Sequence, residues 1–136
     1  MYLENSKNII VKIGSSLIID DKKIIRKKWL LEFAKDIKAL RKKKKNIIIV
    51  SSGAIALGCK KLNIAKKKLK IDQSQAVASV GQIELMNLFK EVFAIQKINI
   101  SQILLTLEDT EIRRRAINAK RTIENLFNLN FIPIVN

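Results

Sequence analysis

The stretch NIIVKIGSS, residues 8–16, decides how the rest of the chain is interpreted. Residues 8–13 are mostly apolar and rich in β-branched side chains, which is typical of a buried strand. Gly14-Ser15-Ser16 follows at once and indicates a turn. Lys12 is the only charged residue in the strand and stands one residue before that turn. The stretch therefore predicts a buried strand that carries a lysine and a turn of small residues at its carboxyl end.

Outward from this stretch, similar apolar runs alternate with helical patterns. Further strands are predicted at residues 47–50, 100–106 and 131–135. Helical spacing of apolar positions predicts helices at about residues 25–43, 54–62, 72–93 and 111–129, with a lysine-rich loop at 63–71. Asp72 is placed to cap the third of these helices. The pattern predicts an α/β fold, a partial three-layer α/β/α sandwich whose mostly parallel sheet is covered by helices on both sides.

The last predicted strand raises two points. Pro133 removes one donor from its ladder, so we expect this strand to be irregular at its centre. A parallel strand this hydrophobic is normally followed by a covering helix and more sheet, but the sequence ends at Asn136. We therefore expect residues 1–136 to be one part of a larger domain.

The charge balance is strongly basic, with a formal net charge of +15. The basic residues are 21 Lys and 6 Arg, and Ile contributes 24 further residues, which indicates a bias along the whole chain. Aromatic residues make up only 5%, so the basic runs at 42–45 and 66–68 lack side chains for stacking on bases. A solvated surface is favoured over a nucleic-acid interface. Arg113-Arg114-Arg115 is the best argument for the latter, because arginine reads phosphates well.

Several classes of function are disfavoured. The chain has no histidine, which removes Ser-His triads and most zinc sites, and we expect no metal ligands. Its one cysteine, Cys59, allows no internal disulfide and has no imidazole to activate it. No apolar run reaches the roughly 18 to 20 residues of a membrane helix, and the N-terminus lacks the apolar core of a secretory signal. We expect a cytoplasmic protein without a membrane partner.

Three features lie where ligands bind in open α/β sheets, beyond the carboxyl ends of the strands. Lys12, with the backbone amides of Gly14 and Ser15, suits a phosphate, although a lysine reaching water before an ordinary turn explains the same residues. The junction Ser52-Gly53-Ala54 between a strand and a helix suits a carboxylate, although small residues also serve tight packing. Asn136 follows the last strand and suits a polar substrate, or simply the surface. Neither standard nucleotide signature, G-x-G-x-x-G or G-x-x-x-x-G-K-[ST], is present.

Taken together, these segments resemble the amino-acid kinase family, especially its glutamate 5-kinase branch. Five segments carry the resemblance, in order and at plausible spacing. They are Ile10–Leu17 (IVKIGSSL); Ile49–Gly58 (IVSSGAIALG); Ala78–Gln82 (ASVGQ) with Glu84–Met86; Leu104–Thr106 with Arg113–Arg115, Asn118, Ala119 and Thr122; and Ile132–Asn136 (IPIVN). The resemblance runs from about residue 8 to the end of the sequence.

The resemblance implies a role for each candidate residue. Lys12 would contact the transferred phosphoryl group, and Gly14 and Ser15 would present amides to the phosphates of ATP. Ser52, with Gly53 and Ala54, would hold the substrate L-glutamate, and Asn136 would lie at the edge of that site. A glutamate side chain has a pKa near ~4.3, so the nucleophile is already ionised and needs no general base.

The resemblance also implies partners and limits. ATP with Mg²⁺ would be the phosphoryl donor, the product would be glutamyl 5-phosphate for proline synthesis, and full-length relatives are homo-oligomeric. Residues 1–136 would be the N-terminal, glutamate-binding part of the domain. The family's acidic catalytic segment, its second lysine and most of its ATP site would lie beyond Asn136, so we expect the chain alone to be inactive.

Two alternatives stay open at this point. The first is an amino-acid kinase for another acceptor, such as aspartate or N-acetylglutamate, against which the Ser52–Gly58 string argues. The second is a small basic α/β module that binds nucleic acid, which rests on charge alone.

Overall fold

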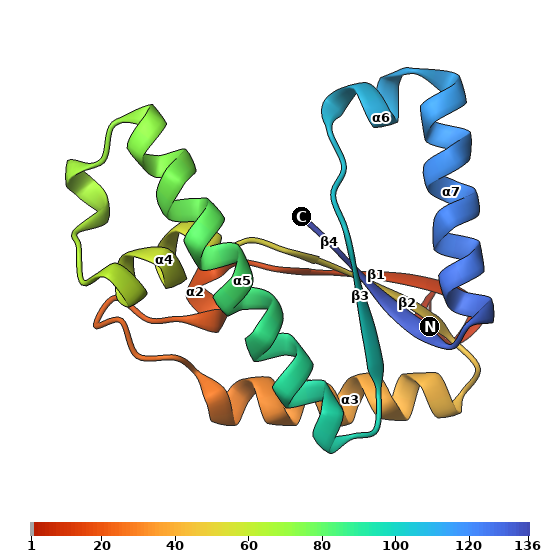
Figure 1. Cartoon of the computed structure of the whole chain (residues 1–136). Helices are drawn as coiled ribbons and strands as arrows, with labels where there is room; N and C mark the ends of the chain where they lie inside the picture. Colours follow the sequence, from red (N-terminus) through yellow and green to blue (C-terminus); the bar gives the residue numbers. More distant parts are fainter. Residues whose placement is uncertain (1) are drawn as a thin grey trace.

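A computed structural model describes residues 2–136, and a four-stranded sheet runs through it (Figure 1). The strands are β1 (Asn8–Ile13), β2 (Asn46–Ser51), β3 (Asn99–Ile103) and β4 (Phe131–Val135). Their order in the sheet is β1-β2-β4-β3, and every neighbouring pair is parallel. All four carboxyl ends therefore lie at one edge of the sheet. The prediction of an α/β fold with a parallel sheet is confirmed.

Four long helices stand close to where the sequence predicted them. They are α3 (Lys27–Lys42), α4 (Ala54–Leu62), α5 (Ile71–Ile95) and α7 (Arg113–Asn128). Four short elements were not predicted: α1 (Tyr2–Asn5), α2 (Ser15–Ile18), the 3-10 turn η1 (Lys66–Lys68) and α6 (Leu107–Glu111). Among the described residues, no helix combines the length and the apolar character needed to cross a membrane.

The start of α5 differs from the expectation. The helix begins at Ile71, so Asp72 lies inside its first turn and does not cap it. The side chain of Gln73 takes the capping role instead, because its Oε1 accepts the backbone N–H of Lys70 at 3.0 Å. A glutamine at the third helical position can turn back on the N-cap amide in this way. Asp72 still places a negative charge near the positive end of the helix dipole.

The hydrophobic core lies on one face of the sheet, which we call the inner face. Alternate strand residues point into it, including Ile13, Ile49 and Ile134, each 1% exposed or less. They meet buried side chains of α3 and α5 such as Leu30, which is fully buried, and Phe89. Burying such side chains drives folding, since each contributes about 1.5–3 kcal/mol relative to exposure.

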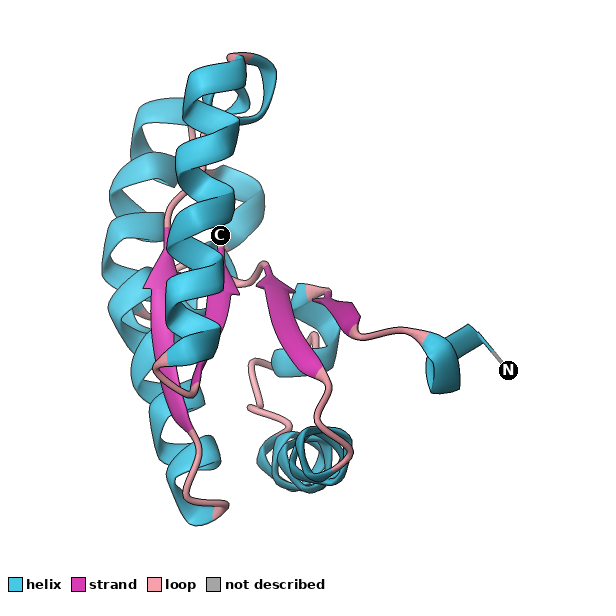
Figure 2. Ribbon diagram, turned by 90° about the vertical axis from the view of Figure 1, so that its right-hand side faces the viewer, coloured by secondary structure: helices cyan, strands magenta, loops and turns pink. Residues whose placement is uncertain are grey.

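The opposite, outer face is covered in part, which agrees with the predicted partial three-layer sandwich. In Figure 2, α7 stands in front of β3 and β4, while no helix lies in front of β1 and β2. Ile10, on the outer face of β1, is 66% exposed, and α7 has no fully buried residue. The outward residues of β1 are Asn8, Ile10 and Lys12, of which two are polar.

Pro133 occupies an interior strand without breaking it. It pairs with Ser101 of β3, whereas the ladder between β4 and β2 contains only Ile134 and Val135 on the β4 side. Proline has no N–H to donate, and a strand tolerates it where one neighbour is not yet hydrogen-bonded. The strand is therefore regular at the point where the sequence indicated irregularity.

Candidate functional site

The turns that follow β1 and β2 touch each other at the carboxyl edge of the sheet. The backbone N–H of Ser52 donates to the carbonyl oxygen of Ile13 at 3.2 Å. A Cβ added at Gly53 would lie 3.4 Å from Cδ1 of Ile18 and 3.7 Å from Cα of Ser15. The Gly14–Ser16 turn and the Ser52–Ala54 junction therefore form one continuous surface.

The two glycines of these turns have different reasons to be glycine. Gly53 has φ +128°, a backbone conformation that residues with a side chain rarely adopt. Gly14 has an ordinary φ of −74°, and a Cβ built there would meet nothing within 4 Å. Nothing in the described part of the chain requires glycine at Gly14, which leaves open space for a ligand above that turn.

Lys12 lies next to this surface but leaves the sheet on its outer face. Its Cα pairs with Val50 of β2, while Ile13, the next residue, points into the core. Side chains alternate along a strand, so Lys12 points away from α5. The side chain is exposed, not buried as an apolar strand suggested. Lys12 therefore lies at the carboxyl end of β1, on the opposite face from Ser51.

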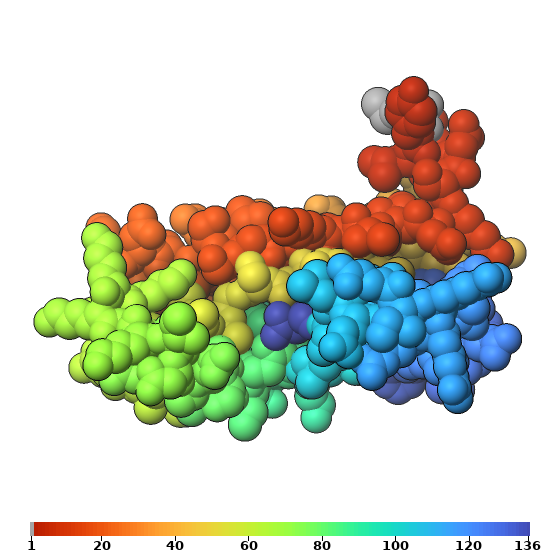
Figure 3. All heavy atoms as spheres, turned by 90° about the horizontal axis from the view of Figure 1, so that it is seen from above, coloured from red at the N-terminus to blue at the C-terminus, as the bar shows by residue number. Residues whose placement is uncertain are grey.

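Asn136 continues β4 and is held from two sides. Its backbone N–H donates to Ile103 at 3.1 Å, and its carbonyl accepts the N–H of Leu105 at 3.4 Å. Its side-chain Nδ2 donates to Oε1 of Gln82 on α5. Because Val50 pairs with Val135, Asn136 lies at the level of Ser51 on the adjacent strand. In the view from above, the dark-blue chain end lies between the yellow segment after β2, the green α5 and the cyan segment after β3 (Figure 3).

Two glycines of the motif segments hold α4 against α5. A Cβ at Gly81 would lie 1.6 Å from the carbonyl oxygen of Ala54, and one at Gly58 would lie 2.2 Å from that of Val77. The helices cross so closely that no side chain fits at either position. Gly81 therefore fixes the N-terminus of α4, where Ala54 lies, and Gln82 directly after it reaches Asn136. The sequence did not assign a role to Gly81 or Gln82, although both stand in a recognised motif.

The two lysine runs do not gather into one surface. The lysines at 42–45 lie at the end of α3, and those at 66–68 in η1, at opposite ends of the molecule (Figure 1). Lys45 is occupied, since its Nζ donates to the carbonyl oxygens of Glu4 and Ser6 at 2.6 and 2.7 Å. The separation of these runs argues against a single nucleic-acid face.

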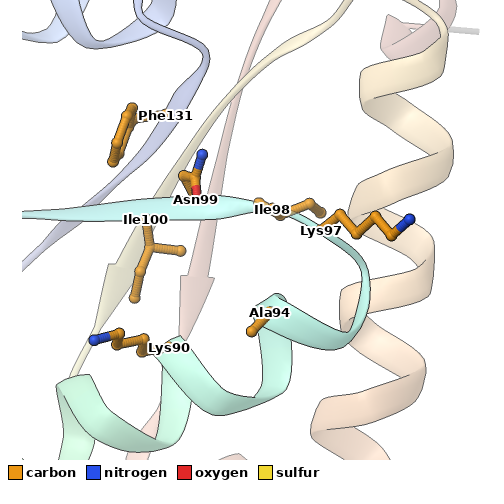
Figure 4. Close-up of a pocket in the computed structure, with 7 residues that line it drawn as sticks. All are labelled: Lys90, Ala94, Lys97, Ile98, Asn99, Ile100 and Phe131. Atoms are coloured by element: carbon orange, nitrogen blue, oxygen red, sulfur yellow. The ribbon is translucent and has the colours of Figure 1, made fainter.

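A hollow of about 510 Å³ lies at the other edge of the sheet, at the amino ends of β3 and β4 (Figure 4). It is lined by Lys90, Ala94, Lys97, Ile98, Asn99, Ile100 and Phe131. In the close-up, the Lys90 and Lys97 side chains extend in different directions from the hollow. Its polar groups do not converge on one point, in contrast with the two turns at the carboxyl edge.

Potential metal ligands do not cluster in the part of the chain that the structure describes. Residues 2–136 contain no cluster of three or more Cys, Asp or Glu side chains that could hold an ion. Cys59 is free and 2% exposed, inside α4.

The geometry agrees with a comparison against protein families. Residues 7–136 match the family described as the amino acid kinase family. The chain belongs to the amino acid kinase family. The matched range contains both turns, the crossing of α4 and α5, and Asn136.

Within this family, the chain is most usefully compared with curated glutamate 5-kinases. The chain is 75% identical over 136 residues to a glutamate 5-kinase of Pelagibacter ubique and 44% identical over 135 residues to one of a Ruegeria species. These matches cover 100% and 98% of the chain but 37% of each relative. The chain thus spans little more than a third of the length of these relatives.

Solved structures support the fold. A carbamate kinase of Giardia matches with a TM-score of 0.60 over 96% of this chain and 59% of that structure, at 10% identity. An isopentenyl phosphate kinase of T. acidophilum matches with a TM-score of 0.58 over 93% of this chain and 53% of that structure, at 11% identity. Identities this low speak for the fold alone.

Proposed function

We propose that residues 1–136 form the N-terminal, glutamate-binding part of a glutamate 5-kinase, which phosphorylates the side-chain carboxylate of L-glutamate with ATP in the cytoplasm. The observation that carries the proposal is the likeness to the Pelagibacter ubique glutamate 5-kinase, which extends over every residue of the chain. Such a reaction would supply glutamyl 5-phosphate as the first step of proline synthesis.

The acceptor side of the reaction is assigned to the turn after β2 and to the end of β4. The amides at the start of α4 suit a carboxylate, because the first amides of a helix have no partner within it. Ser52, Gly53 and Ala54 supply this corner, and Asn136 lies one strand away on β4. Two anchoring points at fixed separation suit a substrate with polar groups at both ends, such as glutamate.

The phosphoryl side is assigned to the turn after β1. The open space over Gly14 lets a phosphate approach the amides of Gly14 and Ser15 closely, which a side chain at Gly14 would hinder. Lys12 lies beside this turn with an exposed side chain, and its ammonium group can offset the charge on the phosphoryl group during transfer. Because the side-chain carboxylate of glutamate is ionised at neutral pH, these residues need only to orient and to neutralise charge.

Mg²⁺ accompanies ATP in the proposal, but its ligands are not assigned to this chain. Mg²⁺ is commonly held by one or two carboxylates together with the phosphates of its nucleotide. The described residues contain no group of three or more such side chains that could hold the ion by themselves. We further propose that the complete enzyme is a homo-oligomer, as the family resemblance implies.

A chimera tests the proposal. The chain replaces the matching segment of the 75%-identical Pelagibacter ubique enzyme, and ADP release is followed with glutamate and ATP. We expect turnover of about 1–100 per second for the chimera and no useful turnover for the isolated chain. A chimera that folds but does not release ADP in response to glutamate contradicts the proposal. Faster turnover with aspartate or N-acetylglutamate would assign the chain to another acceptor.

Two variants of the chimera test the assigned roles. Lys12→Met should lower kcat by about 100- to 1000-fold, as loss of a group that stabilises developing charge does elsewhere. Gly14→Ala should raise the KM for ATP by roughly tenfold or more, because its methyl group would fill the space assigned to a phosphate. Melting temperatures should not change, since Lys12 is exposed and a Cβ at Gly14 meets no atom within 4 Å. An unchanged kcat or KM removes the corresponding residue from the site.

A further inference from the structure

We propose that Gln82 is a positioning residue for the glutamate site, acting through Asn136. The inference rests on the proposed function and adds a residue to which neither the motifs nor the two turns assigned a task. It starts from a hydrogen bond in which the Asn136 side-chain Nδ2 donates to Oε1 of Gln82.

The bond fixes which end of the Asn136 amide is free. An asparagine side chain carries one oxygen that accepts and one nitrogen that donates. With its nitrogen directed at α5, Asn136 presents its oxygen to the surroundings. The free oxygen is an acceptor and suits the ammonium group of an amino acid. The carboxylate at the opposite end of the substrate would then bind the backbone amides at the N-terminus of α4, where Ala54 lies.

The nitrogen of the Gln82 side-chain amide is in an unfavourable environment. Its Nε2 is buried and has no hydrogen-bond partner within the described residues. An unpaired buried donor is unfavourable by about 1–3 kcal/mol, so an apolar residue of the same shape would serve the fold at least as well. A glutamine here is therefore explained better by its contact with Asn136 than by stability.

The neighbouring residue makes Gln82 a rigid support. Gly81 lies in van der Waals contact with Ala54 and Gly58, so the backbone of α5 cannot shift relative to α4 at this point. One helical turn of α5 thus contacts both residues that the proposal assigns to the substrate, Ala54 through Gly81 and Asn136 through Gln82. The distance between the two anchoring points is set by this turn.

The test uses the chimera with Gln82→Met, which keeps the length of the side chain and removes both of its polar atoms. We expect the KM for glutamate to rise roughly three- to tenfold, the size of one lost hydrogen bond, with the KM for ATP unchanged. The melting temperature should stay equal or rise, because the change removes a buried donor, Nε2, that has no hydrogen-bond partner within the described residues. Gln75→Met, on an exposed position of the same helix, is the matched control and should change neither value.

A double variant decides whether Gln82 acts through Asn136. In an Asn136→Ala chimera, adding Gln82→Met should alter the KM for glutamate by less than about twofold. An additive effect, an unchanged KM in the single variant, or a melting temperature well below that of the parent each overturns the positioning role. The proposed function fails separately, if the unmodified chimera does not phosphorylate glutamate, and the positioning role falls with it.

Discussion

At the crossing of α4 and α5, two opposing effects decide whether replacing Gly81 by alanine stabilises or destabilises the chain. Alanine normally stabilises a helix interior relative to glycine, by about 1 kcal/mol. At Gly81, however, the new Cβ would lie 1.6 Å from the carbonyl oxygen of Ala54 and 2.5 Å from the nitrogen of Gly58. Carbon and oxygen atoms in contact need about 3.5 Å, so the helices would have to separate locally by about 2 Å.

The cost of this separation exceeds the gain in helix propensity. Overpacking of a well-packed site destabilises by about 1–3 kcal/mol, and the upper end applies because the atoms in the way belong to backbone, which cannot rotate aside. With about 1 kcal/mol returned by propensity, Gly81→Ala should destabilise the chain by about 2 kcal/mol. For a domain of this size, that lowers the melting temperature by about 6–10 °C.

Circular dichroism on the 136-residue chain measures the effect, with Gly14→Ala as the control. The control introduces the same methyl group where nothing lies within 4 Å, so its melting temperature should stay within about 2 °C of the parent. A Gly81→Ala variant that melts at or above the parent temperature would refute the close crossing of α4 and α5. It would also remove the rigid support on which the positioning role of Gln82 depends.

Three further predictions concern other parts of the fold. Gly53→Ala should destabilise by about 1–3 kcal/mol in urea unfolding, because φ +128° is strained for any side chain, and an unchanged midpoint would contradict that conformation. Phe93→Ala should destabilise by about 3–5 kcal/mol, because the ring is fully buried against Phe33 and Phe89, and a loss below about 1 kcal/mol would show that this centre is not packed. Hydrogen bonds from Thr106 hold the pKa of Asp109 below its usual range, so their contribution to the start of α6 is present above the unfolded pKa and is lost as the pH falls below about 4. The Thr106 amide shift in NMR should follow this titration and be insensitive to acid in Asp109→Asn.

The elements of the fold were predictable because their signals are local. The β-branched runs that contain Ile13, Ile49 and Ile134 became the buried strands, and the small residues between them became turns. The order β1-β2-β4-β3 was not predictable in this way, because it depends on which apolar faces pack together over long range. The face of Lys12 could have been found, since its parity along the strand is opposite to that of Ile13.

In the candidate site, too, the residues marked by local signals were predictable and those that depend on long-range contacts were not. Gly14, Ser15, Ser52 and Gly53 stand at strand ends, so the general rule for α/β sheets located them. The contact of Gln82 with Asn136 joins residues 54 positions apart, and no local sequence pattern predicts it. The roles of Gly58 and Gly81 likewise depend on a helix crossing that composition cannot reveal, although two glycines in otherwise good helices were the available signal.

The bare margin of the sheet at β1 has a consequence for handling the chain. Among the described residues, no strand pairs with β1 on the side away from β2, and Ile10 is exposed on this strand. Unpaired strand margins invite a second molecule to add its own strand, and mutual repulsion between copies carrying +15 charges opposes this. Ions at ~1 M shorten the range of that repulsion to about 3 Å. Concentrated salt should therefore bring copies of the chain together, and light scattering would reveal the clusters.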